Sequence, residues 1–163
     1  VLVRHGSIWV SVYPVFANKL VEKELVEGKL SCLSGYKSFN REVKWGESRF
    51  DFQLDFPVGK VFVEVKSVSL VEKGKGKFPD APTERGIKHL KGLIDLRGKG
   101  CRAAVLFVSQ RSDARSITSN DEIDPQFGEW LRKACRARVE LYAYNCKVTK
   151  NTVSIKNQIP VNI

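Results

Sequence analysis

Apolar and polar residues alternate in part of the chain, in the pattern of a half-buried β-strand. In residues 49–56 every second side chain is apolar, which predicts a strand with one face on a core. The turn-like residues 57–60 lead into a valine-rich segment, 61–68, which predicts the next strand. A preceding strand is expected over residues 37–45, so the three would form a meander. The alternation assigns one face of the middle strand to Phe50, Phe52, Leu54 and Phe56.

Helical spacing of apolar residues predicts three helices. The first spans about residues 18–27, the second about residues 84–97, and the third starts at Pro125. Each starts at or just after a residue type that caps helix N-termini well. The expected caps are Asn18, Thr83 and Asp124.

The remaining apolar segments predict further strands. Residues 103–109 are apolar on both faces, as in a central parallel strand covered by helices. Residues 139–144 predict another strand, a hairpin around residues 150–151 closes the chain, and residues 1–12 have the pattern of two short strands. This order indicates an α/β fold, with a mixed β-sheet flanked by helices.

The charge balance indicates a polyanionic partner. The formal net charge is +10 and the pI is about 9.6, which favours nucleic acid first and an anionic membrane surface second. A merely basic surface is the alternative. No apolar run approaches the roughly 20 residues that a membrane-spanning helix needs, and no signal peptide is recognisable. The sequence does not indicate an oligomeric state.

The four cysteines are scattered singly, which is typical of thiols in a reducing compartment, and we expect a cytoplasmic protein. Because no CxxC pair is present and the two histidines are far apart in sequence, a zinc site is not favoured. Methionine is absent, so the chain is either a fragment or starts at an alternative residue, Val1.

The candidate chemistry lies on two neighbouring strands. Glu64 and Lys66 are two residues apart on one strand and so share a face, and Asp51 of the preceding strand can sit across from Glu64. Two carboxylates can hold Mg²⁺ or Mn²⁺ beside a phosphate, and a lysine can orient a water or stabilise developing charge. Asp-x(n)-Glu-x-Lys is the PD-(D/E)xK pattern of metal-dependent nucleases. The alternative is a solvent-facing sheet surface with an ion pair.

A third acidic ligand is expected from the first helix. Glu24 falls within the apolar arc of that helix and is preferred as a metal ligand, whereas Glu22 points away. For each of them a solvated helix charge is the alternative.

Several longer motifs resemble the sugar fermentation stimulation protein A family. The most specific runs from Phe78 to Leu90, and the match extends from about Ser7 through most of the chain. The other matching segments are 18–20, 33–36, 42–52, 63–68, 102–111, 123–125 and 159–161. In this resemblance the helical acidic residue would fall at Lys23, between Glu22 and Glu24, which leaves that ligand open.

The resemblance implies a restriction-endonuclease-like, PD-(D/E)xK domain over residues 14–163. Residues 1–13 would be the last strands of an N-terminal OB-type barrel or its connection. It also implies DNA binding and a link to sugar metabolism. Two hypotheses follow: a Mg²⁺-dependent nuclease acting on DNA, or a non-catalytic, sequence-nonspecific DNA-binding regulator of sugar metabolism. An RNA-processing enzyme is a third, weaker possibility.

Basic residues of two segments are the candidate nucleic-acid contacts. Arg85, Lys88 and His89 are expected on the exposed face of the second helix, where they could bind phosphates. Glycine-spaced lysines would lie in a loop over residues 72–82, and two polar residues would end the central strand. These further candidates are Lys73, Lys75, Lys77, Gln110 and Arg111.

Overall fold

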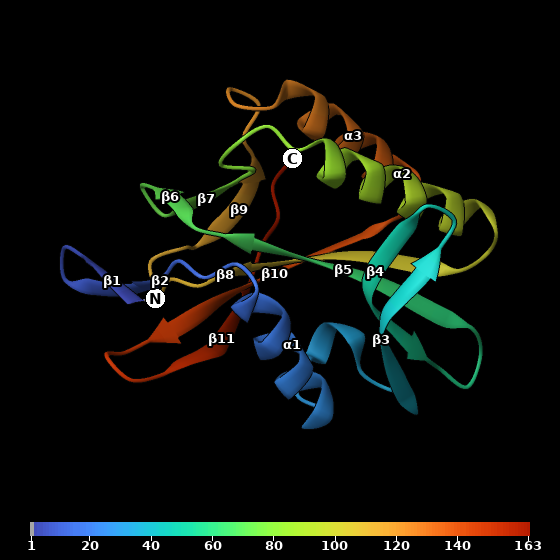
Figure 1. Cartoon of the computed structure of the whole chain (residues 1–163), viewed down its shortest axis with the longest axis horizontal. Coiled ribbons are helices and arrows are strands. Elements are labelled where there is room, and N and C mark those ends of the chain that lie inside the picture. Colours follow the sequence, from blue (N-terminus) through green and yellow to red (C-terminus); the bar gives the residue numbers. More distant parts are fainter. Residues whose placement is uncertain (1) are drawn as a thin grey trace.

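A six-stranded mixed β-sheet forms the centre of the computed structural model, which describes residues 2–163 (Figure 1). Its strand order is β11-β10-β8-β5-β4-β3. The predicted α/β class with a mixed sheet is therefore confirmed. The six strands are β3 (Ser38–Trp45), β4 (Ser48–Asp55), β5 (Lys60–Val68), β8 (Arg102–Ser109), β10 (Glu140–Val148) and β11 (Val153–Ile159).

Helices cover both faces of this sheet, and the sheet separates two apolar cores. Helix α1 (Phe16–Val26) lies on one face, and α2 (Glu84–Gly98) and α3 (Pro125–Arg136) lie together on the other (Figure 1). A short 3₁₀ turn, η1 (Ser31–Leu33), follows α1 and adds to its core. Strand β8 pairs in parallel with β5 and β10 and is buried almost throughout, as its apolar sequence predicts.

Two of the three expected helix caps are confirmed. The side chain of Thr83 accepts a hydrogen bond from the backbone amide of Gly86, and that of Asp124 accepts one from Phe127. The third expectation is wrong, because α1 starts at Phe16 and has no side-chain cap. Asn18 lies inside the first turn instead, and its side chain contacts Asp51.

Two small sheets lie beside the central one. β1 (Leu2–His5) and β2 (Ile8–Ser11) form the expected N-terminal hairpin. β6 (Leu70–Glu72), β7 (Lys75–Phe78) and β9 (Ser116–Ser119) form a second sheet, so the segment expected to be a lysine-rich loop is largely a hairpin. Within residues 2–163 no helix has the length and apolar character needed to cross a membrane.

The meander departs from regular alternation at Asp51. Phe50 packs into the core beneath α2, whereas Phe52 packs into the core beneath α1, so these two residues do not share the face we expected. The β4–β5 pairing ends at Phe52 and Val63, and β4 separates from β5 beyond this point. Asp51 is therefore placed where two paired strands begin to diverge.

Candidate active site

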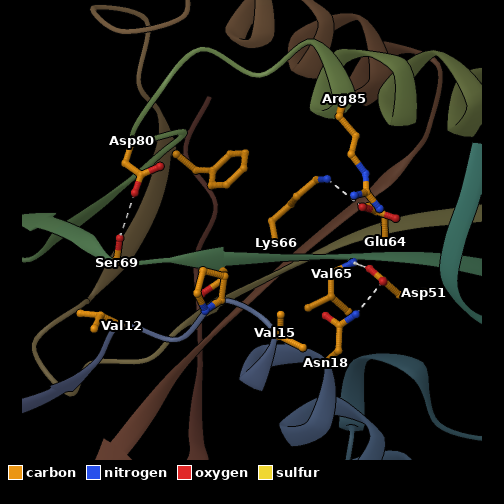
Figure 2. Close-up of a pocket in the computed structure, with 13 residues that line it drawn as sticks. Val12, Val15, Asn18, Asp51, Glu64, Val65, Lys66, Ser69, Asp80 and Arg85 are labelled. Atoms are coloured by element: carbon orange, nitrogen blue, oxygen red, sulfur yellow. Dashed lines mark hydrogen bonds and ion pairs between the residues drawn. The ribbon is translucent and has the colours of Figure 1, made fainter. Parts of the chain in front are cut away.

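Asp51, Glu64 and Lys66 line one pocket of about 500 Å³ (Figure 2). β4 supplies Asp51, and β5 supplies the other two from alternate positions on the face beneath α2. The expectation that the three side chains converge is confirmed. Further residues of the wall are Val12, Pro14, Val15, Asn18, Val65, Ser67, Ser69, Phe78, Asp80 and Arg85.

The Asp51 carboxylate connects the two diverging strands by a hydrogen bond. Its Oδ2 accepts a 2.7 Å hydrogen bond from the backbone amide of Val65, and its Oδ1 accepts a 2.6 Å bond from Nδ2 of Asn18. Burial raises the pKa of Asp51 to about 6, and the negative charge of Glu64 adds to this rise. The two hydrogen bonds act in the opposite direction but do not outweigh burial. The charge of Lys66 also lowers this pKa without outweighing burial, and an added cation would favour the ionised form further.

Glu64 is a buried carboxylate with one oxygen engaged and the other free. Oε1 lies 2.7 Å from Nζ of Lys66 and 2.5 Å from Nδ1 of His89, and the residue is 4% exposed. Burial alone would raise the pKa of Glu64, but the hydrogen bond from His89 and the charge of Lys66 outweigh it and lower the pKa. Oε2 has no hydrogen-bond partner within residues 2–163, although it is shielded from solvent. An unpaired buried carboxylate oxygen is costly without a ligand.

Two basic side chains supply positive charge to the pocket. The side chain of Lys66 is only 11% exposed, and its Nζ also lies 3.1 Å from Nδ1 of His89. Arg85 extends from the first turn of α2 into the same pocket and is otherwise exposed (Figure 2). This end of the pocket thus combines the two carboxylates of Asp51 and Glu64 with an ammonium and a guanidinium.

The residues present fit a divalent cation held by two carboxylates. Oε2 of Glu64 has no hydrogen-bond partner among residues 2–163. The pKa of Asp51 is raised, and a neighbouring cation would lower it. Over residues 2–163 no group of three or more acidic, histidine or cysteine side chains has the arrangement of a metal site. Protein ligands would therefore be few, as is usual for Mg²⁺, which keeps several waters.

The expected third ligand does not reach the pocket. Glu24 lies outside the pocket wall, and Glu22 forms an ion pair with Arg41 on β3. The physical reason is the position of α1, whose first turn rather than its middle approaches the site. The helical contribution is consequently Asn18, an amide that holds Asp51. The sequence offered Asn18 as a helix cap and as part of the matching segment 18–20, but neither feature assigned it this role.

Three expected nucleic-acid contacts are buried. His89 is 4% exposed and faces Glu64, so its placement on the exposed helix face is wrong. Gln110 donates hydrogen bonds to the carbonyl of Tyr13 and to Ser67. Arg111 is held by Asp113 and by the Ser69 carbonyl. The side chains of Gln110 and Arg111 are thus tied into contacts that follow the end of β8, and Arg111 also lines a hollow beside the N-terminal hairpin.

The remaining lysines lie on separate surfaces. Lys88 is exposed and lies 3.7 Å from Glu47, outside the pocket that Arg85 lines. Lys73 and Lys75 are exposed on the β6–β7 hairpin, while Lys77 is paired with Glu72 on the same hairpin. Of the expected basic contacts, only Arg85 shares the pocket of the carboxylates.

Comparison with known proteins identifies close relatives. The family model described as "Sugar fermentation stimulation protein RE domain" matches residues 15–152. A sugar fermentation stimulation protein homolog of Desulforamulus reducens is 48% identical over 99% of this chain and 68% of its own length. A homolog of Caldanaerobacter subterraneus is 42% identical over 96% of this chain and 68% of its own length. The chain thus spans about two thirds of these relatives.

A solved structure shares the fold. It is described as "The structure of Pyrococcus Furiosus SfsA in complex with Ca2+" and has a TM-score of 0.86 and 31% identity to this chain. The match covers 91% of this chain and 65% of the other. Sequence and fold agree, and the resemblance noted in the sequence is confirmed: the chain belongs to the sugar fermentation stimulation protein family.

Proposed function

We propose that the chain is a divalent-cation-dependent phosphodiesterase that acts on DNA. The observation that carries this proposal is the free, buried Oε2 of Glu64 beside Asp51, with Lys66 in the same pocket. The relative from Pyrococcus furiosus is described as a Ca²⁺ complex, which supports the divalent cation in this proposal. The PD-(D/E)xK pattern of the sequence gives these residue types the same roles.

Each side chain has a distinct task in this proposal. Asp51 and Oε2 of Glu64 would hold Mg²⁺ or Mn²⁺, which supplies charge neutralisation of the phosphate and a more acidic bound water. Lys66 places an ammonium where negative charge develops, and its bond to Glu64 holds it there. Arg85 binds a phosphate oxygen at the pocket mouth. Asn18 and the Val65 amide orient Asp51.

The DNA part of the proposal rests on charge. The net charge of +10 favours a polyanion, and β7, which carries the exposed Lys75, also supplies Phe78 to the pocket wall. Contacts of this kind give affinity without sequence readout. We therefore expect a weak dependence on base sequence and a steep dependence on salt.

Cleavage assays test the proposal. Single-stranded, duplex and branched DNA are incubated with Mg²⁺ or Mn²⁺, and Lys66→Ala is compared with Lys44→Ala, an exposed lysine of β3 outside the pocket. We expect Lys66→Ala to lose activity by a factor of at least about 100, as for other lost charge-stabilising groups, and Lys44→Ala to retain it. Cleavage that persists unchanged in Lys66→Ala would refute the assignment.

One observation favours a second candidate, a DNA-binding protein without turnover. Within residues 2–163 no third acidic side chain joins Asp51 and Glu64 in the arrangement of a metal site, and Nζ of Lys66 is already paired with Glu64. This candidate predicts salt-sensitive DNA binding that Glu64→Gln leaves intact and no cleavage with any divalent cation. Metal-dependent cleavage abolished by Glu64→Gln would exclude it.

A further inference from the structure

A groove continues from the carboxylate pocket toward the N-terminal hairpin. The pocket shares Val12, Ser69 and Asp80 with a neighbouring hollow of about 330 Å³. That hollow extends to His5 and Arg111, between β1–β2 on one side and β6 on the other. In Figure 1 the β1–β2 and β6–β7 hairpins project at the same end of the molecule. The two hollows therefore form one path that passes Asp80.

The chemistry of the wall changes along this path. Charged groups concentrate at the end where Glu64, Lys66 and Arg85 lie. Toward the hairpins the wall becomes mainly apolar and accessible, with Val3 46% and Val12 45% exposed, and its polar residues there are His5, Ser69, Asp80 and Arg111. The apolar residues of the two hollows are Val3, Val10, Val12, Pro14, Val15, Val65, Leu70 and Phe78.

An apolar wall beside a phosphate site fits only some forms of nucleic acid. A duplex presents phosphates and sugars outward and keeps its base faces stacked inside, whereas an unpaired strand exposes base faces that pack on apolar side chains. The exposed carboxylate of Asp80 in the middle of the path would repel a phosphate but can accept a hydrogen bond from a base amino group. Bases therefore suit this part of the groove better than backbone does.

We infer that the groove takes an unpaired DNA strand, an inference that rests on the proposed function. One phosphate lies at Lys66 and Arg85, and the adjoining bases lie along Val12, Val15 and Phe78 toward the β1–β2 hairpin. The substrate class is single-stranded DNA or the unpaired end or flap of a duplex.

Binding without cleavage tests this inference. Fluorescence anisotropy is measured in EDTA and at moderate salt, with a short labelled single strand, its duplex, and RNA of the same sequence. The test variant is Val12→Ser/Val15→Ser, which makes two exposed apolar residues of the wall polar. The control variant is Val26→Ser/Val58→Ser, two exposed valines away from the groove.

We expect the single strand of DNA to bind about tenfold more tightly than the duplex, and the test variant to lose most of this preference, because two apolar contact surfaces for the bases become polar. The control variant should bind as the parent chain does. Equal affinity for both forms, tighter binding of the RNA, or an unaffected test variant would overturn the inference. Absence of cleavage with the preference intact would refute only the proposed nuclease. Cleavage without the preference would refute only the unpaired-strand groove.

Discussion

Nδ1 of His89 lies 2.5 Å from Oε1 of Glu64, and both side chains are buried. The imidazole and Lys66 together engage one carboxylate oxygen and leave Oε2 without a hydrogen-bond partner among residues 2–163. His89 is therefore a positioning residue for the carboxylate that we propose as a cation ligand. Its role is structural with respect to DNA, because it is not accessible to a phosphate.

Replacing His89 should weaken cation binding, because its imidazole orients the Glu64 carboxylate. Loss of a group that orients a metal ligand typically lowers metal affinity about 10- to 100-fold, and we expect a decrease in this range for Mn²⁺ with His89→Ala. Isothermal titration calorimetry measures it without turnover. Lys88→Ala, one residue earlier on the exposed side, is the control, and His89→Gln should recover part of the affinity by restoring a donor. Equal Mn²⁺ affinity in all three variants would contradict the positioning role.

Asp51→Asn should stabilise the cation-free protein at mildly alkaline pH. Because the folded pKa of Asp51 is raised from 3.8 to about 6, its contribution to stability is fully present below 3.8 and is lost as pH rises through about 6. A neutral asparagine avoids that loss. We therefore expect the free energy of unfolding to rise by up to about 3 kcal/mol, and this gain to shrink as the solution is acidified. Asn18 can accommodate the change by rotating its amide.

Urea unfolding in EDTA across this pH range measures the effect. Asp55→Asn on the same strand removes the same charge outside the pocket and serves as the control. Saturating Mn²⁺ should make the parent chain more stable than Asp51→Asn, because only the parent chain keeps both carboxylates. A pH-independent difference between parent and Asp51→Asn would show that charge burial is not its cause.

Asn18→Asp should convert the helical amide into a third acidic ligand. The side chain already lies within 2.6 Å of Asp51, so the variant adds a carboxylate beside those of Asp51 and Glu64. We expect tighter Mn²⁺ binding, by about tenfold, and lower stability without the cation, because like charges at close range repel. Thermal unfolding with and without Mn²⁺ measures both effects, with Asn151→Asp in an exposed turn as the control. An unchanged Mn²⁺-dependent shift would place Asn18 outside the cation site.

Lys73 and Lys75 should contribute to the salt dependence of DNA binding. Each phosphate contact adds about 0.9 to the slope of log affinity against log salt for duplex DNA, so Lys73→Ala/Lys75→Ala should reduce it by roughly 1 to 2. Lys37→Ala/Lys44→Ala removes the same charge at the β3 edge of the central sheet and serves as the control. Equal slopes for the two double variants would mean that the β6–β7 hairpin makes no special contact.

Local patterns were sufficient to predict most of the architecture. The apolar run of β8 indicated a parallel central strand, and Thr83 and Asp124 marked two helix starts, because each property depends on neighbouring residues in the sequence. The shared face of Glu64 and Lys66 follows from strand geometry alone. The prediction that Asp51 lies beside them is also confirmed, although it depended on a specific pairing of two strands.

The errors arose where distant segments determine the outcome. Phe50 and Phe52 lie in different cores because β4 leaves β5 between them, and strict alternation cannot indicate such a divergence. β7 forms a strand through pairing with β9, some forty residues later in the chain. His89 looks like a surface residue beside Lys88, and only the buried carboxylate of Glu64 on another element explains its position.

The hydrogen bond from the Val65 amide to Asp51 has a consequence for the sheet itself. Past the last β4–β5 pair this amide has a side-chain carboxylate as its partner in place of a backbone carbonyl. Any event that draws Asp51 toward the pocket centre therefore breaks this link between β4 and β5, although β5 stays paired with β8 as far as Val68. The exchange rate of a single backbone proton, at Val65, is thus a direct gauge of how tightly the site is assembled.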